Sequence, residues 1–257
     1  MSAGVAFATL IGPAAVPKRH IASREKSLLD TVAHELRNPL TSLRLSLDML
    51  INDFDELEPQ TALRLVQRAQ RSASWLQTLT ENLTSAACVE SGHLDVQLRT
   101  LDVLECLEQA VLLVHAVLEQ RHQTVCFSST AASTMAVADP ARTVQVVANL
   151  LSNASRYSVE GDEIELHVSP VGQQLRVCVT DHGPGISPED QQRIFGAWVR
   201  VEGSAPGGLG LGLNIVQNLV QQQGGRVGID STLGQGATFW FTLPAAVELG
   251  AVAACGL

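Results

Sequence analysis

The sequence predicts two domains of different class, an all-α helical hairpin followed by a domain that mixes helices with strands. Up to about residue 87, apolar residues recur every three or four positions, as they do in amphipathic helices. After Gly92 the pattern changes to short alternating strands separated by helices. A length of 257 residues also suits two small domains better than one.

Composition and charge argue against several functional classes. The 17 basic and 26 acidic residues give a net charge of −9, which argues against a nucleic-acid-binding surface. The five cysteines are odd in number and contain no C-x-x-C pair, and no two histidines follow H-x-x-x-H spacing, so we do not expect a zinc site. We interpret the cysteines as reduced thiols of a cytosolic protein.

The first residues form an apolar run that is too short to cross a bilayer. Residues 3–16 are uncharged, but these 14 residues fall short of the roughly 20 that a membrane-spanning helix needs. No basic stretch precedes them, so they do not resemble a signal peptide. We expect residues 1–20 to be either a flexible leader or the cut end of a longer segment, and we expect no clear membrane span.

Residues 21–92 are predicted to form the helical hairpin. One helix is expected over 18–52 and a second over 59–87, with the acidic stretch 52–58 as the link. Each helix carries one apolar stripe, and a lone hairpin leaves half of that surface in water. We therefore expect two chains to pair as a homodimeric four-helix bundle, with docking onto the second domain as the alternative.

The first helix carries a candidate nucleophile, His34. A neutral imidazole nitrogen can attack phosphorus without prior deprotonation, and the carboxylate of Glu35 can stabilise the cation that forms. Asn38 lies one turn further along on the same face, and Pro39 removes a backbone donor and is expected to bend the helix. Taken alone, a His-Glu pair on a helix is more often a solvated surface pair.

Residues 93–245 are predicted to form the mixed domain. A helix is expected over 104–120, following Asp102, then a strand over 124–127 and a helix that Asp139 caps and Pro140 begins. On this last helix one polar face combines side chains suited to Mg²⁺, phosphate and a nucleobase. These are Asn149, Asn153, Arg156 and Tyr157. The alternative is an ordinary polar helix face.

An acidic residue ends the next predicted strand, 175–180. Asp181 precedes Gly183 and Gly185, so its carboxylate can accept from an exocyclic amine while the glycines let the backbone approach a planar base. Ser187 and Pro188 then predict a capped short helix that continues to Phe195.

A glycine-rich segment precedes the last predicted helix, which should continue to about Gln223. Its backbone amides are expected to hold phosphates near the helix N-terminus. The segment contains Gly207, Gly208, Leu209, Gly210, Leu211, Gly212 and Leu213. Its spacing fits neither a P-loop nor a dinucleotide-binding turn. Two strands at 226–230 and 237–243 are expected to close the domain as a hairpin.

Read in order, these motifs resemble the sensor histidine kinases of two-component systems. The resemblance covers roughly residues 23–244 and runs from His34 through the paired asparagines and Asp181 to the glycine-rich segment. It implies a dimerisation and phosphoacceptor hairpin followed by an α/β two-layer sandwich ATP-binding domain of the Bergerat type, with residues 246–257 as a tail. ATP and Mg²⁺ are the implied cofactors.

The resemblance also implies a role for each matching residue. His34 is similar to the phosphoacceptor, Glu35 to its assisting base, and Asn38 to a residue that helps dephosphorylate the partner. Asn153 resembles the Mg²⁺ ligand, with Asn149, Arg156 and Arg200 near phosphates and Tyr157 beside the base. Asp181 resembles the adenine-reading acid, with Thr238 supporting it through a water. The glycine-rich segment 208–213 resembles the phosphate-binding loop.

The implied activity is autophosphorylation of His34 and transfer of the phosphoryl group to an aspartate of a response regulator receiver domain. Two alternatives are an ATP-hydrolysing conformational switch and a scaffold or phosphatase with the same fold. The expected location is the cytoplasm, either as a free protein or as the cytoplasmic part of a membrane-associated kinase. The segment 196–206, which would form a lid over ATP, is short, and Arg156 replaces the commoner lysine of the family.

Overall fold

The computed structural model of the chain describes residues 18–53, 57–91, 96–200 and 209–246. Within these ranges the side chains of 18–31, 34, 78, 81, 86 and 88–91 are not described. The predictions for residues 1–17, 54–56, 92–95, 201–208 and 247–257 lie outside the described residues. They concern most of the leader, the middle of the acidic link, the domain boundary, half of the lid with Gly207 and Gly208, and the tail.

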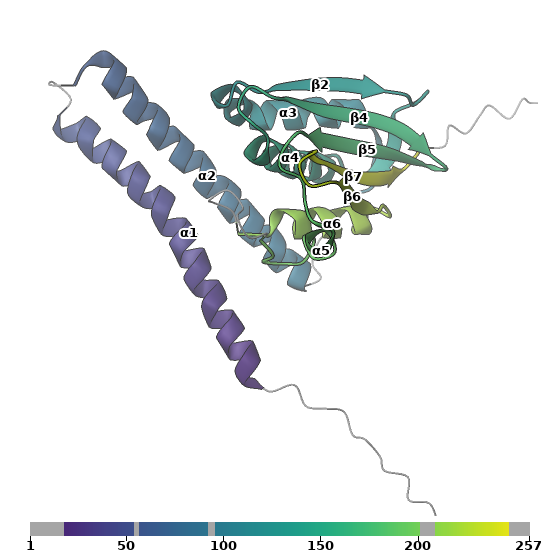
Figure 1. Ribbon diagram of the computed structural model, residues 1–257, viewed down its shortest axis with the longest axis horizontal. Coiled ribbons are helices and arrows are strands. Elements are labelled where there is room, and N and C mark those ends of the chain that lie inside the picture. Colours follow the sequence, from purple (N-terminus) through teal and green to yellow (C-terminus); the bar gives the residue numbers. More distant parts are fainter. Residues whose placement is uncertain (1–17, 54–56, 92–95, 201–208, 247–257) are drawn as a thin grey trace, which may run out of the picture. The chain divides into compact units, whose positions relative to one another are not determined.

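The N-terminal part is a pair of long helices, α1 (Lys18–Asn52) and α2 (Pro59–Ser91) (Figure 1). Both begin where the sequence predicts, and α2 continues four residues beyond the predicted end at Ala87. Arg68 Nε, in the first part of α2, donates to Ser42 Oγ of α1 at 3.0 Å, which links these two segments. Pro59 begins α2 because its missing N–H lies among the helix-terminal donors that have no intrahelical partner.

Contacts divide the chain into two compact units, Met1–Ala69 and Gln70–Leu257. The division falls inside α2, so the C-terminal two thirds of this helix belong to the second unit. Among the described residues, none of the helices is both long and apolar enough to cross a membrane.

The second unit contains a mixed α/β domain. In chain order its elements are β1 (Arg99–Asp102), α3 (Val103–Gln120), β2 (Thr124–Ser129), β3 (Met135–Ala138), α4 (Pro140–Tyr157), β4 (Glu163–Val171), β5 (Gln174–Asp181), α5 (Pro188–Gln191), α6 (Gly212–Gln222), β6 (Val227–Ser231) and β7 (Ala237–Pro244). Most agree with the predicted elements. No strand was predicted at β1, β3 or β4, although Ile164, Leu166 and Val168 alternate in β4 as strand residues do.

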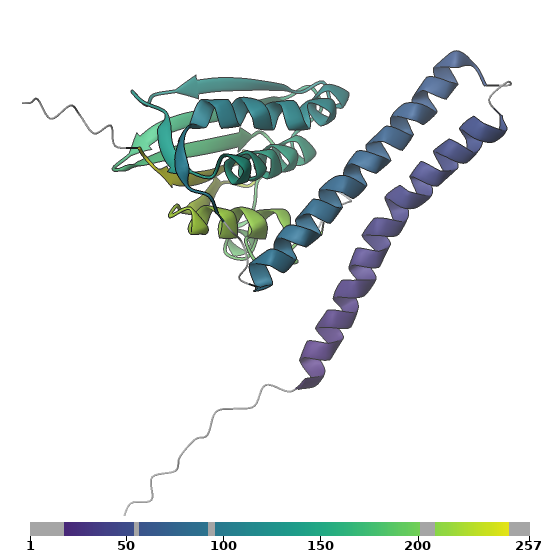
Figure 2. The ribbon, with the colours of Figure 1, turned by 180° about the vertical axis from the view of Figure 1, so that it is seen from behind.

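The main sheet has five strands in the order β2-β4-β5-β7-β6, and β1 pairs with β3 in a separate two-stranded sheet. Strands β2 and β4 are parallel, while the other neighbours in the main sheet are antiparallel. Helices α3, α4 and α6 cover one face of the main sheet (Figures 1 and 2). This is the two-layer α/β sandwich that the sequence predicted.

The layer between helices and sheet is the hydrophobic core of the sandwich. Alternate residues of β4, β5 and β7 point into it, as the period of two in a strand requires. The largest fully buried side chains include Leu107, Leu150, Leu151, Ile164, Leu166, Ile215, Leu219, Phe241 and Leu243. Residues of the same strands that point to the other face of the sheet are more exposed.

Candidate functional site

Helix α4 carries the predicted polar face, and both of its ends are fixed by side chains. At the N-terminus Asp139 Oδ1 accepts from Arg142 N at 3.2 Å, while Oδ2 accepts from Gln97 N at 2.9 Å. The apolar stripe of α4 is buried, and the predicted ligands Asn149 and Asn153 are half-buried on an adjoining face. The helix therefore presents polar side chains from a rigid support, as a binding site requires.

Asp181 is the last residue of β5 and is 4% exposed. The N–H of Gly183 donates to Asp181 Oδ1 at 2.9 Å. Burial raises the pKa of the Asp181 carboxyl, although hydrogen bonds from the N–H groups of Gly183 and Ala237 oppose that rise. Because burial shields this acceptor from water, its remaining hydrogen bonds must come from a neighbouring group, and the exocyclic amine of a base could supply one.

The C-terminus of α4 lies against the Asp181 motif. A Cβ added at Gly183 would lie 2.8 Å from the carbonyl oxygen of Tyr157, so only glycine fits there without a shift. The exposed Tyr157 and half-buried Arg156 occupy this last turn. The last turn of α4, which carries two of the predicted ligand residues, therefore lies beside the Asp181 motif.

The turn between β6 and β7 packs against the second glycine of the same motif. Gly185 has φ of +71° and its backbone contacts the carbonyl oxygen of Thr232, so a side chain there would meet both strain and backbone. Gly234 N donates to Pro184 O at 2.7 Å. These contacts fix the backbone beside Asp181.

The described part of the glycine-rich segment reaches the same site. A Cβ added at Gly212, the first residue of α6, would lie 3.6 Å from Asn149 Oδ1. No side chain caps this helix, so its first N–H groups can donate to an anion. Leu209 and Leu211 are buried, at 6% and 1% exposure, which leaves their backbone as the part suited to a ligand. Leu213 is half-buried.

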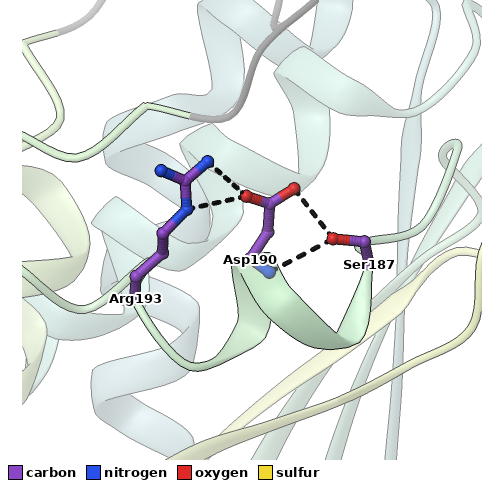
Figure 3. Close-up of polar contacts among 3 residues, drawn as sticks. All are labelled: Ser187, Asp190 and Arg193. Carbon is purple, nitrogen blue, oxygen red and sulfur yellow. Dashed lines mark hydrogen bonds and ion pairs between the residues drawn. The ribbon is translucent and has the colours of Figure 1, made fainter.

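The segment from Ser187 to Arg200 begins with a tight polar cap. Ser187 Oγ accepts from Asp190 N at 3.1 Å and donates to Asp190 Oδ2 at 2.9 Å, while Arg193 Nη2 donates to Asp190 Oδ1 at 2.6 Å (Figure 3). Hydrogen bonds from Arg193 and Ser187 lower the pKa of Asp190.

The prediction that the helix continues to Phe195 was wrong. Helix α5 ends at Gln191, because the chain then tightens into turns whose hydrogen bonds span three residues, such as Arg193 N to Asp190 O.

The remainder of this segment is attached to α6 and to the glycine-rich segment. Asn214 Nδ2 donates to Phe195 O at 3.1 Å, and Trp198 N donates to Gly210 O at 3.0 Å. Trp198 has φ of +65°, a left-handed conformation that is uncommon for a bulky residue. Arg200 is exposed and lies two residues after Trp198, whose N–H bonds Gly210.

Thr238 does not lie beside Asp181 in the structure. Across β5 and β7, Asp181 pairs with Ala237 and Thr180 pairs with Thr238. Paired residues share a face of the sheet and adjacent residues do not, so Thr238 points to the face opposite Asp181. Its hydroxyl lies 2.9 Å from that of Thr180.

Arg156 also contacts an aromatic residue of α2 within the second unit. Its guanidinium carbon lies 5.1 Å from the centroid of the Trp75 ring, a distance typical of a cation-π pair. Gln145 Nε2 donates to Ser85 Oγ at 3.0 Å. The outer face of α4 therefore takes part in contacts with α2 as well as in the candidate nucleotide site.

The predicted phosphoacceptor motif lies within α1. Glu35 is half-buried, Asn38 is exposed and Pro39 is buried, while the side chain of His34 lies outside the described residues. His34 and Asn38 are four residues apart in a continuous helix and so share a face. Both Glu35 and Asn38 have interaction partners.

Some residues of the site region were not identified from sequence. The side chains of Gln123, Asn214 and Ser231 hydrogen-bond backbone groups of distant segments, and the hydroxyl of Ser155 donates to Gln123 Oε1. Each is a single polar residue in an ordinary context, so no local pattern marks it.

Comparisons with known proteins agree with this architecture. Residues 24–92 match the family described as His Kinase A (phospho-acceptor) domain, and residues 138–247 match Histidine kinase-, DNA gyrase B-, and HSP90-like ATPase. The chain is 32% identical over 224 residues to the adaptive-response sensory kinase SasA of Thermosynechococcus vestitus, covering 84% of this chain and 59% of that protein. It is 34% identical over 227 residues to the sensor protein RstB of Escherichia coli, covering 87% and 49%.

Solved structures give the same result. Histidine kinase AdeS of Acinetobacter baumannii superposes with a TM-score of 0.59 at 25% identity, covering 82% of this chain and 97% of that one. Full-length ShkA in complex with AMPPNP superposes with a TM-score of 0.62 at 27% identity, covering 86% and 46%.

The fold and the site together define a phosphoacceptor hairpin joined to an ATPase-type sandwich. The chain belongs to the sensor histidine kinases of two-component systems. It spans about half the length of the relatives SasA and RstB.

Proposed function

We propose that this chain transfers the γ-phosphoryl group of ATP to His34 and then to an aspartate of a response regulator receiver domain. One observation carries the proposal. The α4 polar face, the buried Asp181 and the uncapped N-terminus of α6 lie close together, because Gly183 abuts the Tyr157 carbonyl and a Cβ at Gly212 would reach Asn149 Oδ1. Such a site offers an amine-reading acid at one end and anion-binding amides at the other.

In this proposal each end of the nucleotide has its own residues. Asp181 accepts from the exocyclic amine of adenine, and the exposed Tyr157 ring stacks beside the base. The amides of segment 208–213 with Asn149, Arg156 and Arg200 contact the phosphates. The relative ShkA was solved with AMPPNP, which supports a nucleotide in the corresponding domain.

The half-buried carboxamide of Asn153 is the group that would hold Mg²⁺. Its oxygen is a hard donor, as Mg²⁺ requires, and it lies one turn from Asn149 on the same helix face. When bound, the ion would neutralise charge on the phosphates.

The chemical step needs a nucleophile and a group that stabilises the positive charge that forms on it. A ring nitrogen of His34 forms a bond to the γ-phosphorus as the bond from that phosphorus to the bridging oxygen of ADP breaks, and Glu35 stabilises the charged imidazole. The phosphoryl group then passes to an aspartate carboxylate of the receiver, which regenerates neutral His34. We place this chemistry in the cytoplasm, where ATP and the receiver are found.

Hydrolysis of ATP without a phosphoprotein is the main competing function. A hydrolase would need a base to activate water, and the position four residues before Asn153 holds the carboxamide of Asn149. A carboxamide cannot accept a proton at neutral pH, so slow hydrolysis is expected. Asn38 could still assist dephosphorylation of the receiver as a second activity.

The hairpin supports a homodimer. Its helices expose large apolar side chains, and two hairpins could bury these against each other as a four-helix bundle. The exposed residues are Leu40, Leu45, Leu47, Met49, Ile51, Leu63 and Val66.

The direct test is incubation of the chain with γ-labelled ATP. Wild type should gain one acid-labile, base-stable label per chain, while His34→Ala and Asn153→Ala should gain none and keep wild-type circular dichroism. The label should move to a receiver protein added later. Equal labelling of His34→Ala would refute the assignment of the phosphoacceptor, and release of free phosphate without a phosphoprotein would favour the hydrolase.

A further inference from the structure

The turn between α3 and β2 is hydrogen-bonded to the loop that follows α4. Arg121 Nη2 donates to Ser158 O at 2.7 Å, and Gly161 N donates to Arg121 O at 2.9 Å. Thr124 N donates to Asp162 O at 3.2 Å. The turn therefore holds the exit of α4 although it lies more than thirty residues away in sequence.

Gln123 belongs to this turn, lies among these hydrogen bonds and is 6% exposed. Its Nε2 donates to Ser155 O at 3.2 Å and to Val159 O at 3.0 Å, and its Oε1 accepts from Ser155 Oγ at 2.6 Å. The preceding His122 has φ of +53°, the left-handed conformation that reverses the chain here. The amide nitrogen and the amide oxygen of Gln123 are thus both used, on the last turn of α4 and on the segment that follows it.

Ser155 O belongs to the last turn of α4, where helical carbonyls have no intrahelical partner, and Val159 lies two residues beyond the helix end at Tyr157. Gln123 supplies the missing donors from another segment. The same turn carries Arg156 and Tyr157, and the Tyr157 carbonyl abuts Gly183, whose N–H bonds Asp181. A shift of this turn would therefore change the spacing between the phosphate-side residues of α4 and the base-side acid.

We propose that Gln123 is a positioning residue for nucleotide binding, which sets the register of the last turn of α4 against Asp181. The inference rests on the nucleotide site proposed above. Gln123 touches no nucleotide itself and acts through the backbone that it holds.

The chain contains a matched control at the opposite end of α4. Gln223 is 1% exposed, and its Oε1 accepts from Asp139 N at 2.9 Å and from Thr143 Oγ1 at 3.3 Å. Its Nε2 donates to Leu219 O at 2.9 Å. This glutamine is equally buried and makes as many hydrogen bonds, but it holds the end of α4 that carries no predicted ligand.

The experiment compares Gln123→Met with Gln223→Met in the full chain, because methionine keeps the size of glutamine and removes its polar atoms. Binding of ADP is measured by calorimetry at a temperature where unfolding curves show each variant to be folded. Both variants should lose a similar amount of stability. We expect Gln123→Met to raise the Kd for ADP about tenfold, as loss of a buried hydrogen-bond network would, and Gln223→Met to change it by less than about twofold.

A milder variant keeps the inference testable if Gln123→Met does not fold. Ser155→Ala removes only the hydroxyl that donates to Gln123 Oε1, and we expect it to raise the Kd for ADP about threefold. An unchanged Kd in the Gln123 and Ser155 variants, or equal weakening in Gln223→Met, would overturn the positioning role. Failure of wild type to bind ADP would instead overturn the proposed nucleotide site.

Discussion

The helical hairpin and the sandwich bury their apolar residues to very different degrees. Among the described side chains of the first unit, the buried aliphatic ones are Leu65, Ala69 and the ring of Pro39. Larger ones such as Leu40 and Ile51 remain 58% and 76% exposed. In the sandwich, by contrast, the aliphatic side chains of β4 and β5 that face the helices, such as Ile164, Leu166 and Val177, have no exposure.

The difference shows which region carries its own core. A helix pair has two apolar stripes and can cover only part of each, whereas a sheet covered by three helices encloses a full layer. The sandwich should therefore fold independently of chain concentration. The hairpin should depend on a second copy, so its stability should rise with concentration.

The largest effect is expected from a cavity in the sandwich core. Phe241 in β7 is 0% exposed, and Phe241→Ala should lower the free energy of unfolding by about 3–5 kcal/mol through lost burial and the cavity left behind. Denaturant titration at two chain concentrations measures this loss. Leu233→Ala, at a position 63% exposed, is the control and should change stability by less than about 0.5 kcal/mol. A loss below about 1 kcal/mol for Phe241→Ala would contradict the description of this core.

The next effect concerns the one buried acid of the proposed nucleotide site. Asp181→Asn should weaken ADP binding by about tenfold to a hundredfold, because the amide presents both a donor and an acceptor to a ligand that needs an acceptor. Calorimetry with ADP measures the change. Wild-type affinity in this variant would remove Asp181 from the base-reading role.

The stability of the same variant should depend on pH in a defined direction. Because burial raises the pKa of Asp181 in the folded chain, the folded state holds its proton more tightly than the unfolded state. The stability that this proton contributes is complete below the unfolded pKa of about 3.9 and is lost as pH rises through the folded pKa. Asp181→Asn should therefore gain stability relative to wild type as pH rises from acid to neutral. If Asp181→Asn instead lost stability relative to wild type as pH rises, the folded chain would stabilise the charged carboxylate.

A smaller effect tests the dependence of the hairpin on a partner. Ile51→Asp should weaken the proposed dimer at least about tenfold, since a carboxylate would have to leave water at the interface. Sedimentation equilibrium measures it, and the unfolding of the sandwich should not change. Leu112→Asp on α3, where the native residue is 72% exposed, is the matched control and should leave the dimer intact. Equal dissociation of both variants, or a monomeric wild type, would argue against the four-helix bundle.

The smallest effect is expected on the face of the sheet that the helices do not cover. Thr238→Val removes the hydroxyl that pairs with Thr180, so it should change the Kd for ADP by less than about twofold and stability by about 1 kcal/mol. A tenfold weaker affinity would instead support the role that the family resemblance implies for Thr238.

Local patterns predicted most of the fold because their causes are local. The leucine stripes of α1 and α2, the caps predicted at Asp139 and Ser187 and the helix start predicted after Asp102 depend on residues within a few positions. The structure has each of these helix starts to within one residue. The end of α5 was predicted wrongly, because the residues after Gln191 form tight turns, such as those closed by Arg193 N to Asp190 O and by Gly196 N to Arg193 O. Strand β4 was missed although its alternation is regular.

The candidate site was predicted in part. The motifs at Asn149, Asp181 and Gly212 were found from residue type and spacing, and the structure brings them together. The face on which Thr238 points follows instead from the pairing of β5 with β7, since a shift by one residue in that register reverses every side chain.

The sequence by itself determined the two-domain order, the helix and strand periods, and the family, because these follow from repeats and motifs along the chain. Only the tertiary structure decided which residues hold the site in place. The partners of Gln123 lie 32 and 36 residues away in sequence, and Asp181 of β5 pairs with Ala237 of the neighbouring strand β7. Such contacts depend on how separate segments pack, and no nearest-neighbour pattern along the chain encodes them.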